Sequence, residues 1–370
     1  MEGNKKTARE IIDSYDGRPL RIMEVCGTHT HEIFRLGIRS ILPPAVKLIS
    51  GPGCPVCVTP VDYIDEAVML ALEHGAKICT FGDLIRVPGS ARSLADARAQ
   101  GADLRVVYSP ADAVKIAAAD PDTQVVFLSV GFETTTPGAC LAVKQAEEQG
   151  LSNFSLLTAN KTMPNAYRAL KDSVDAYLYP GHVHAIIGTK LCEQMAAGES
   201  CGGRACPESE ADKIPGTRRS EGVSGVVAGF TAKELLTAIA VIIEKSKTGE
   251  PFFVNCYPRV VKPEGNPAAL RMIEEVMEPC DAEWRGLGVI ADSGLKLRDE
   301  YAAFDARKKF SLPKIEGRYN PACRCGDVLR GECRPCDCGV FGRGCTPEHP
   351  IGACMVSGEG ACSAWYQYGI

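Results

Sequence analysis

The chain has 370 residues, of which 45% are hydrophobic and 24% charged, a composition typical of a soluble globular protein with room for two or three domains. Its formal net charge of -5 gives no support to nucleic acid as a partner, and no apolar run approaches the roughly 20 residues of a membrane span. The N-terminal residues lack the apolar core of a secretion signal, so we expect a cytoplasmic protein.

Residues 20–245 alternate short, β-rich apolar runs with amphipathic helical patterns. This alternation predicts parallel sheets covered by helices on both faces. Two smaller α/β domains fit the number of strands better by size than one large sheet does. The predicted strands span residues 20–25, 46–50, 77–81, 105–109, 124–130, 154–159, 176–180 and 225–230.

The rest of the chain differs in character. Residues 198–222 are polar and rich in Gly and Pro, which predicts a surface excursion. Residues 251–300 return to mixed α/β patterns, but from about residue 313 the periodicity fades and Gly, Pro and Cys dominate.

Cysteine is the unusual component of this sequence. Eighteen cysteines would indicate a disulfide framework in a small secreted protein, but in a large cytoplasmic chain they indicate metal binding or thiol chemistry. Eight of them lie between Cys323 and Cys362. A bound metal cluster would stabilise a segment that cannot easily bury a core of its own.

The first candidate site follows the strand at residues 20–25, where Cys26 is followed by His29, His31 and a helical pattern. Sites in α/β proteins form where strands end and helices begin, and a helix N-terminus lowers the pKa of a nearby thiol. The Cys-x-x-His-x-His spacing also offers one sulfur and two imidazoles to a metal. A buried cysteine followed by two capping or core histidines is the competing interpretation.

The second candidate site is "GPGCPVCVTP", which contains Cys54 and Cys57. Thr59-Pro60 predicts a helix start, with the threonine as cap and the proline at the first helical position. Both sulfurs then lie near the positive end of that helix, which favours thiolates and redox activity. The same spacing allows half of a metal site or a rigid turn, and these alternatives stay open.

The third candidate site is the C-terminal cysteine run. Four thiolates hold a 4Fe-4S cluster, and a zinc site with four cysteine ligands is the alternative. A further C-x-x-C pair, Cys333 and Cys336, makes the choice of ligands ambiguous. The predicted cluster ligands are Cys338, Cys345 and Cys362, preceded by Cys323 or Cys325.

Two weaker candidates lie elsewhere in the α/β region. Glu133 and three threonines precede a predicted helix, where its N-terminus suits an anion or a polar partner. His182 and His184 follow the strand at 176–180. Ordinary capping and packing explain both segments at least as well.

Three long segments and two shorter ones carry a family resemblance. The long segments are "MEVCGTHTHEIFRLGIRSILP", "LISGPGCPVCVTPVDYID" and "FGRGCTPEHPIGACMVSGEGAC". The shorter ones are "SVGFETTTP" and "YPGHVHAIIG". Together they resemble the HypD family of NiFe-hydrogenase maturation factors, and the resemblance covers nearly the whole chain. The "GFTAKELL" segment departs from the family's Gly-Phe-Glu-Pro form.

The resemblance implies a redox scaffold on which the Fe(CN)2CO unit of NiFe-hydrogenase is assembled. Its partners would be HypC and HypE, the latter delivering cyanide from a thiocyanate on its C-terminal cysteine. An iron–sulfur-dependent thiol-disulfide oxidoreductase is the alternative function. A zinc-stabilised interaction protein is a third.

The resemblance also implies a role for each candidate residue. Cys26 would bind the nascent iron together with a HypC cysteine, with His29 and His31 beside it. Cys54 and Cys57 would be the redox-active pair. The C-terminal cysteines would hold a 4Fe-4S cluster in a domain similar to ferredoxin-thioredoxin reductase.

The implied architecture is two similar α/β domains plus the iron–sulfur domain. We expect domain I at residues 44–132 and domain II at residues 133–250. Domain III would combine residues 1–43 with residues 251–370.

Overall fold

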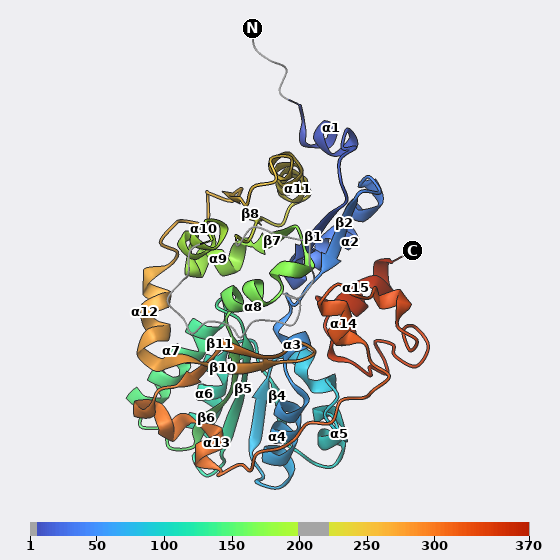
Figure 1. Ribbon diagram of the computed structural model, residues 1–370. Coiled ribbons are helices and arrows are strands. Elements are labelled where there is room, and N and C mark those ends of the chain that lie inside the picture. The colour runs from blue at the N-terminus through green and yellow to red at the C-terminus, as the bar shows by residue number, and fades with distance from the viewer. Residues whose placement is uncertain (1–5, 199–221, 370) are drawn as a thin grey trace.

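The computed structural model describes residues 6–198 and 222–369, so nearly all of the predicted excursion at 198–222 lies outside the described residues. Two β-sheets organise the molecule, one in the upper and one in the lower half of Figure 1. The C-terminal segment, drawn in red, lies to one side, near α2 and α3.

The upper sheet has five strands in the order β2-β1-β7-β8-β9, and all of its pairings are parallel. The chain leaves β1 for β2 on one side and later returns to β7 on the other. The carboxyl end of β1 therefore lies at a topological switch point, where α/β sheets form ligand-binding crevices. The strands are β1 Leu20–Glu24, β2 Val46–Ser50, β7 Ala176–Pro180, β8 Gly225–Ala228 and β9 Phe253–Asn255.

The lower sheet has six strands in the order β10-β11-β6-β5-β3-β4. Its four strands from β3 to β6 are parallel, and the antiparallel hairpin β10–β11 extends the sheet beside β6. The strands are β3 Lys77–Thr80, β4 Leu104–Val106, β5 Val125–Gly131, β6 Phe154–Lys161, β10 Met277–Trp284 and β11 Gly288–Leu297.

The central strand β5 is buried on both of its faces, which explains its mostly apolar sequence. Successive side chains of a strand point to opposite faces, and every residue of β5 is buried. Val125 and Phe127 join a core with residues of α6 and α7, whereas Val126 and Leu128 join a second core that includes α4. Helices therefore cover both faces of this sheet, as the sequence predicts.

The helices connect the strands and cover the sheets. On the upper sheet, α11 shares a core with β1 and β7. Within the described ranges, no helix combines the length and the apolar character needed to cross a membrane. The α-helices are α1 Ala8–Asp13, α2 Gly27–Arg35, α3 Pro55–Val58, α4 Val61–Leu72, α5 Leu94–Ala99, α6 Pro110–Ala119, α7 Thr136–Glu148, α8 Met163–Ala169, α9 Gly181–Ile187, α10 Lys190–Ala196, α11 Ala232–Ser246, α12 Pro267–Val276, α13 Ala306–Lys309, α14 Cys325–Leu329 and α15 Ala361–Tyr368.

The structure confirms the eight predicted strands, which are β1 to β8, and the mixed α/β character of residues 251–300. Neither sheet is built from one continuous stretch of the chain. The chain passes from the upper sheet to the lower, back to the upper and again to the lower. The ranges 44–132 and 133–250 concern domains rather than sheets, and they stay a prediction.

The predicted helix start at Thr59-Pro60 is wrong in detail. Residues 55–58 form the additional short helix α3, with Cys54 as its N-cap. Thr59 ends this helix, and its hydroxyl donates to the carbonyl oxygen of Pro55 at 2.8 Å. The next helix, α4, begins at Val61 after Pro60. Pro60 rather than Thr59 is therefore the N-cap of the predicted helix, and Cys54 is the N-cap of α3.

A buried ion pair fixes the end of β1 to the elements that follow it. The Glu24 side chain is fully buried, and its carboxylate accepts from Arg39 Nη2 at 2.5 Å and from Thr30 Oγ1 at 3.0 Å. Arg39 also donates to the carbonyl oxygen of Leu48 in β2. The pair thus connects β1, α2 and β2 at the carboxyl end of β1, two residues before Cys26.

We expect Arg39→Met to lower the free energy of unfolding by about 3–5 kcal/mol, because it leaves the Glu24 carboxylate buried without its cation. The matched control is Arg35→Met, since Arg35 pairs with Glu32 at the half-exposed end of α2. That change should cost less than about 1 kcal/mol. Urea unfolding of both variants measures the difference, and equal losses would contradict a special role for the buried pair.

Candidate functional site

The site begins where β1 and β2 end side by side. Their parallel register pairs Glu24 with Ser50, so the two following loops leave the sheet at the same level. The Gly27 amide donates to the carbonyl oxygen of Gly53 at 3.0 Å. A β-carbon on Gly53 would overlap the backbone of Cys26. This close approach therefore requires glycine, and it brings the Cys26 and Cys54 loops into contact.

Cys26 is the N-cap of α2 and is 2% exposed. Burial raises the pKa of its thiol to about 12, although hydrogen bonds from the amides of His29 and Thr28 oppose the shift. The expected lowering by the helix N-terminus is therefore outweighed by burial. A thiol of this kind keeps its proton in the absence of a metal and releases it when a metal ion binds.

Cys54 and Cys57 are both buried and differ in acidity. A hydrogen bond from the Cys57 thiol lowers the pKa of Cys54, against the effect of burial and with help from Ser357. The single Ser357 hydroxyl proton also reaches Asp83 Oδ2 at 2.9 Å, which leaves the Cys57 thiol as the principal donor. Hydrogen bonding to the thiols of Cys354 and Cys54 raises the pKa of Cys57 well above its usual value. Cys54 is therefore the member of the pair that ionises first.

Six cysteines line one small cavity of about 20 Å³ in the C-terminal part of the chain, which we call the six-cysteine pocket. All five predicted cluster ligands are among them, and Cys354 is the sixth. Cys333 and Cys336 do not line this cavity. The six residues are Cys323, Cys325, Cys338, Cys345, Cys354 and Cys362.

The six-cysteine pocket has features that suit thiolate ligands. The amide of Ile351 donates to Cys345 Sγ at 3.3 Å, and a β-carbon on Gly352 would lie 2.5 Å from Cys323 Sγ. Burial and four neighbouring cysteines raise the pKa of Cys362 well above its usual value. In residues 6–198 and 222–369, no group of three or more His, Cys, Asp or Glu side chains is arranged to hold a single metal ion.

An iron–sulfur cluster fits the donor chemistry of this pocket, because cysteine thiolates are its usual ligands. The cavity as it stands has room for about one water molecule.

Cys354 connects the dithiol to the six-cysteine pocket. It lies 1% exposed in the short turn Ala353–Met355, hydrogen-bonds to Cys57 and lines the pocket with its own side chain. The Cys57 sulfur is also 4.0 Å from the carbonyl oxygen of Ala353. The structure thus gives a continuous order from Cys26 through Cys54, Cys57 and Cys354 to the pocket. The sequence analysis missed Cys354, although its place in the C-terminal cysteine run was an available signal.

Glu359 is a second residue that the sequence analysis missed. Its carboxylate accepts from Thr28 Oγ1 at 2.6 Å, and its side chain lies directly against the backbone of Gly27. Its negative charge contributes to raising the pKa of Cys26 and opposes ionisation of Cys54. An exposed carboxylate therefore stands at the edge of the cysteine site.

The two histidines after Cys26 have different surroundings. His29 is fully buried, with Nε2 3.0 Å from the carbonyl oxygen of Gly229, and burial lowers its pKa to about 3. Its imidazole is therefore neutral and donates through Nε2, while Nδ1 has no partner within the described part of the chain. His31 places Nδ1 3.3 Å from the carbonyl oxygen of Gly358 in the C-terminal segment.

The weaker candidates make packing contacts. Glu133 is buried, which raises its pKa to about 7, and its carboxylate accepts from the amide of Met163 at 2.8 Å. His184 places Nδ1 2.8 Å from the carbonyl oxygen of Gly188 and Nε2 3.9 Å from Cys192 Sγ. The His182 ring stacks on Phe230, the ring that also contacts His29.

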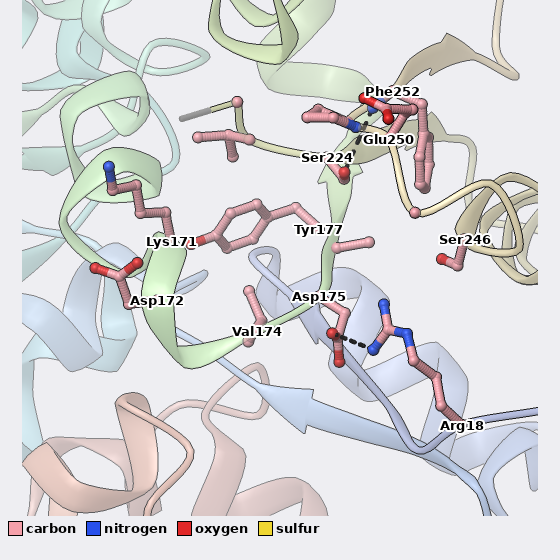
Figure 2. Close-up of a pocket in the computed structure, with 15 residues that line it drawn as sticks. Arg18, Lys171, Asp172, Val174, Asp175, Tyr177, Ser224, Ser246, Glu250 and Phe252 are labelled. Atoms are coloured by element: carbon pink, nitrogen blue, oxygen red, sulfur yellow. Dashed lines mark hydrogen bonds and ion pairs between the residues drawn. The ribbon is translucent and has the colours of Figure 1, made fainter. Parts of the chain in front are cut away.

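A separate cavity of about 400 Å³ lies at the amino ends of β7 and β8, at the edge of the upper sheet opposite the cysteine site. Figure 2 shows Arg18 and Asp175 paired in it, with a nitrogen–oxygen distance of 2.6 Å. Among the described residues that line it, there is no cysteine or histidine.

The chain is similar to known proteins over nearly its whole length. A family model described as "HypD: Hydrogenase formation hypA family" matches residues 2–201 and 214–369. The hydrogenase maturation factors HypD of Rhodobacter capsulatus and Escherichia coli K12 are each 42% identical, over 95% of this chain and 90% of theirs. That of Azotobacter vinelandii is 40% identical, over 98% of this chain and 93% of its own.

We expect Gly53→Ala to lower the free energy of unfolding by about 1–3 kcal/mol, because the added methyl group must push the Cys26 backbone away. Gly82→Ala is the matched control, since its nearest contact would be an ordinary 3.9 Å to Val106. It should change stability by no more than about 0.5 kcal/mol. Urea unfolding measures both, and a Gly53→Ala protein as stable as the control would contradict the close approach.

We expect Cys57→Ala to shift the pH profile of Cys54 alkylation upward by about one unit, because Cys54 loses its principal hydrogen-bond donor. Cys57→Ser keeps a donor at the same place and should retain most of the wild-type profile. Mass spectrometry of the alkylated Cys54 peptide at several pH values gives the midpoint for each variant. Unchanged midpoints in both variants would contradict the assignment of the Cys57 thiol as the hydrogen-bond donor to Cys54.

Proposed function

The chain belongs to the HypD family of hydrogenase maturation factors, and we propose that it is the redox scaffold on which the Fe(CN)2CO unit of NiFe-hydrogenase is assembled. The observation that carries the proposal is the order Cys26, Cys54, Cys57, Cys354 and six-cysteine pocket. The proposed partners are HypC and HypE, and the proposed compartment is the cytoplasm.

Cys26 is the proposed binding residue for the iron that is being assembled. A thiolate suits a low-spin ferrous ion that carries cyanide and carbon monoxide, and it can be exchanged when the unit is handed on. Because the thiol is buried and protonated, iron binding must displace its proton. Glu359 stands close enough to influence that proton electrostatically. His29 and His31 are the proposed neighbours of the iron.

Cys54 and Cys57 are the proposed source of the electrons that release cyanide. Oxidation of the two thiols to a disulfide yields two electrons and two protons. Reduction of a thiocyanate on the HypE cysteine consumes both, breaks the S–CN bond and gives a thiol and hydrogen cyanide. The lowered pKa of Cys54 makes it the nucleophilic member of this pair.

The six-cysteine pocket is the proposed site of a 4Fe-4S cluster, within a C-terminal domain that we propose resembles ferredoxin-thioredoxin reductase. Cys338, Cys345 and Cys362 would hold it together with Cys323 or Cys325. Such a cluster supplies single electrons when bound. Cys354 would then remain free to contact Cys57, as the hydrogen bond between them indicates.

We expect Cys26→Ala to abolish the cyanide and carbon monoxide infrared bands of the complex with HypC, together with the iron that Cys26 would bind, while the sulfide content and the iron of the C-terminal cluster stay unchanged. Cys79→Ala is the matched control, because Cys79 is a fully buried cysteine in β3 and is away from the site. It should keep both the bands and the iron.

Wild-type bands in the Cys26→Ala complex would overturn the assembly role of Cys26. Rapid turnover of disulfide substrates without HypC would instead favour the thiol-disulfide oxidoreductase. Zinc without iron or sulfide in anaerobically prepared protein would favour the zinc-stabilised interaction protein.

A further inference from the structure

A second cavity, of about 480 Å³, lies beside the six-cysteine pocket, and we call it the arginine pocket. Cys323 and Cys325 line both cavities, so two cysteine residues separate them. The other walls include Arg285, Arg318 and Tyr319. Its volume is within the usual range for small-molecule sites.

Arg285 is the unusual residue of this pocket, because it is a charged side chain that is only 2% exposed. Its Nε donates to the carbonyl oxygen of Thr59 at 2.7 Å, whereas its Nη2 is buried and has no hydrogen-bond partner among the residues that the structure describes. Among the described residues, no carboxylate lies within ion-pair distance of it. A buried guanidinium without an anion is costly, so this position calls for a negative partner.

The other residues that line the arginine pocket also favour a negatively charged partner. Arg318 is exposed, and in the described part of the chain it has no carboxylate partner and no Asp or Glu lines the pocket. The nearby Glu283 is engaged by the hydroxyl of Tyr319 at 2.9 Å. The Arg285 guanidinium lies 5.7 Å from the centre of the Tyr319 ring, at the wall of the cavity. Two guanidinium groups therefore face a cavity that no described carboxylate lines.

We propose that the arginine pocket binds an oxyanion, with Arg285 and Arg318 as its cationic ligands. A guanidinium matches the planar fork of a carboxylate and also binds tetrahedral oxyanions. The source is either a free small anion or a carboxylate group presented by a partner protein. The proposal is independent of hydrogenase maturation, because the proposed ligands Arg285 and Arg318 take no part in the proposed assembly of the iron unit.

The test is isothermal titration calorimetry of the full-length protein, purified anaerobically, at constant ionic strength. The probes are sodium acetate, sodium sulfate, and a short peptide ending in either a free carboxylate or an amide. We expect saturable binding of at least one oxyanion. Arg318→Gln should weaken it about tenfold, and Arg285→Gln should weaken it further. Arg271→Gln, on the exposed surface of α12, is the matched control and should bind as the wild type does.

The two sources give different results. Binding of acetate or sulfate without any preference for the peptide acid identifies a free anion, and preference for the peptide acid over its amide identifies a partner's carboxylate. Arg318→Gln keeps the test valid if Arg285→Gln does not fold, because Arg318 lies in an exposed segment. Absence of saturable binding to every probe, or equal loss in Arg271→Gln, would overturn the proposal. None of these readouts depends on cyanide or carbon monoxide.

Discussion

The contact between Gly53 and the backbone of Cys26 is the constraint on which the rest of the site depends. Parallel pairing makes β1 and β2 end level, but only a residue without a β-carbon lets their loops touch. The touching loops hold Cys54 at the start of α3. The C-terminal segment then packs on both, with Glu359 against Gly27 and Ala353 near Cys57. A cysteine site assembled from three distant segments follows from one backbone contact.

Burial raises the pKa values of the Cys26 and Cys54 thiols, whereas hydrogen bonds lower them. The larger of the two effects differs between these thiols. A helix N-terminus contributes about 0.3–1 kcal/mol, or less than one pKa unit, whereas full burial shifts a pKa by up to about 3–5 units. At Cys26 burial therefore prevails and the thiol stays protonated. At Cys54 the direct bond from the Cys57 thiol prevails over burial. The site thus combines a protonated thiol at Cys26 with a more acidic thiol at Cys54.

Local patterns in the sequence predict the strands, because apolar β-branched runs between turn residues need no distant information. The same patterns do not reveal that β6 pairs with β11, or that Cys54 caps a four-residue helix. Pairing and capping depend on contacts between distant segments. Cys354 and Glu359 escaped prediction for the same reason, since their partners Cys57 and Thr28 lie about 300 residues away along the chain.

The six-cysteine pocket and the arginine pocket share a wall, which Cys323 and Cys325 form. The Cys325 thiol is the first cause of the raised pKa of Cys323, and the positive charge of Arg285 opposes the shift. An anion bound to Arg285 would cancel that opposition and disfavour negative charge on the cysteines. Coupling of this kind is reciprocal, so thiolates in the six-cysteine pocket must weaken anion binding beside it. An anion in the arginine pocket and a thiolate at Cys323 would thus each disfavour the other.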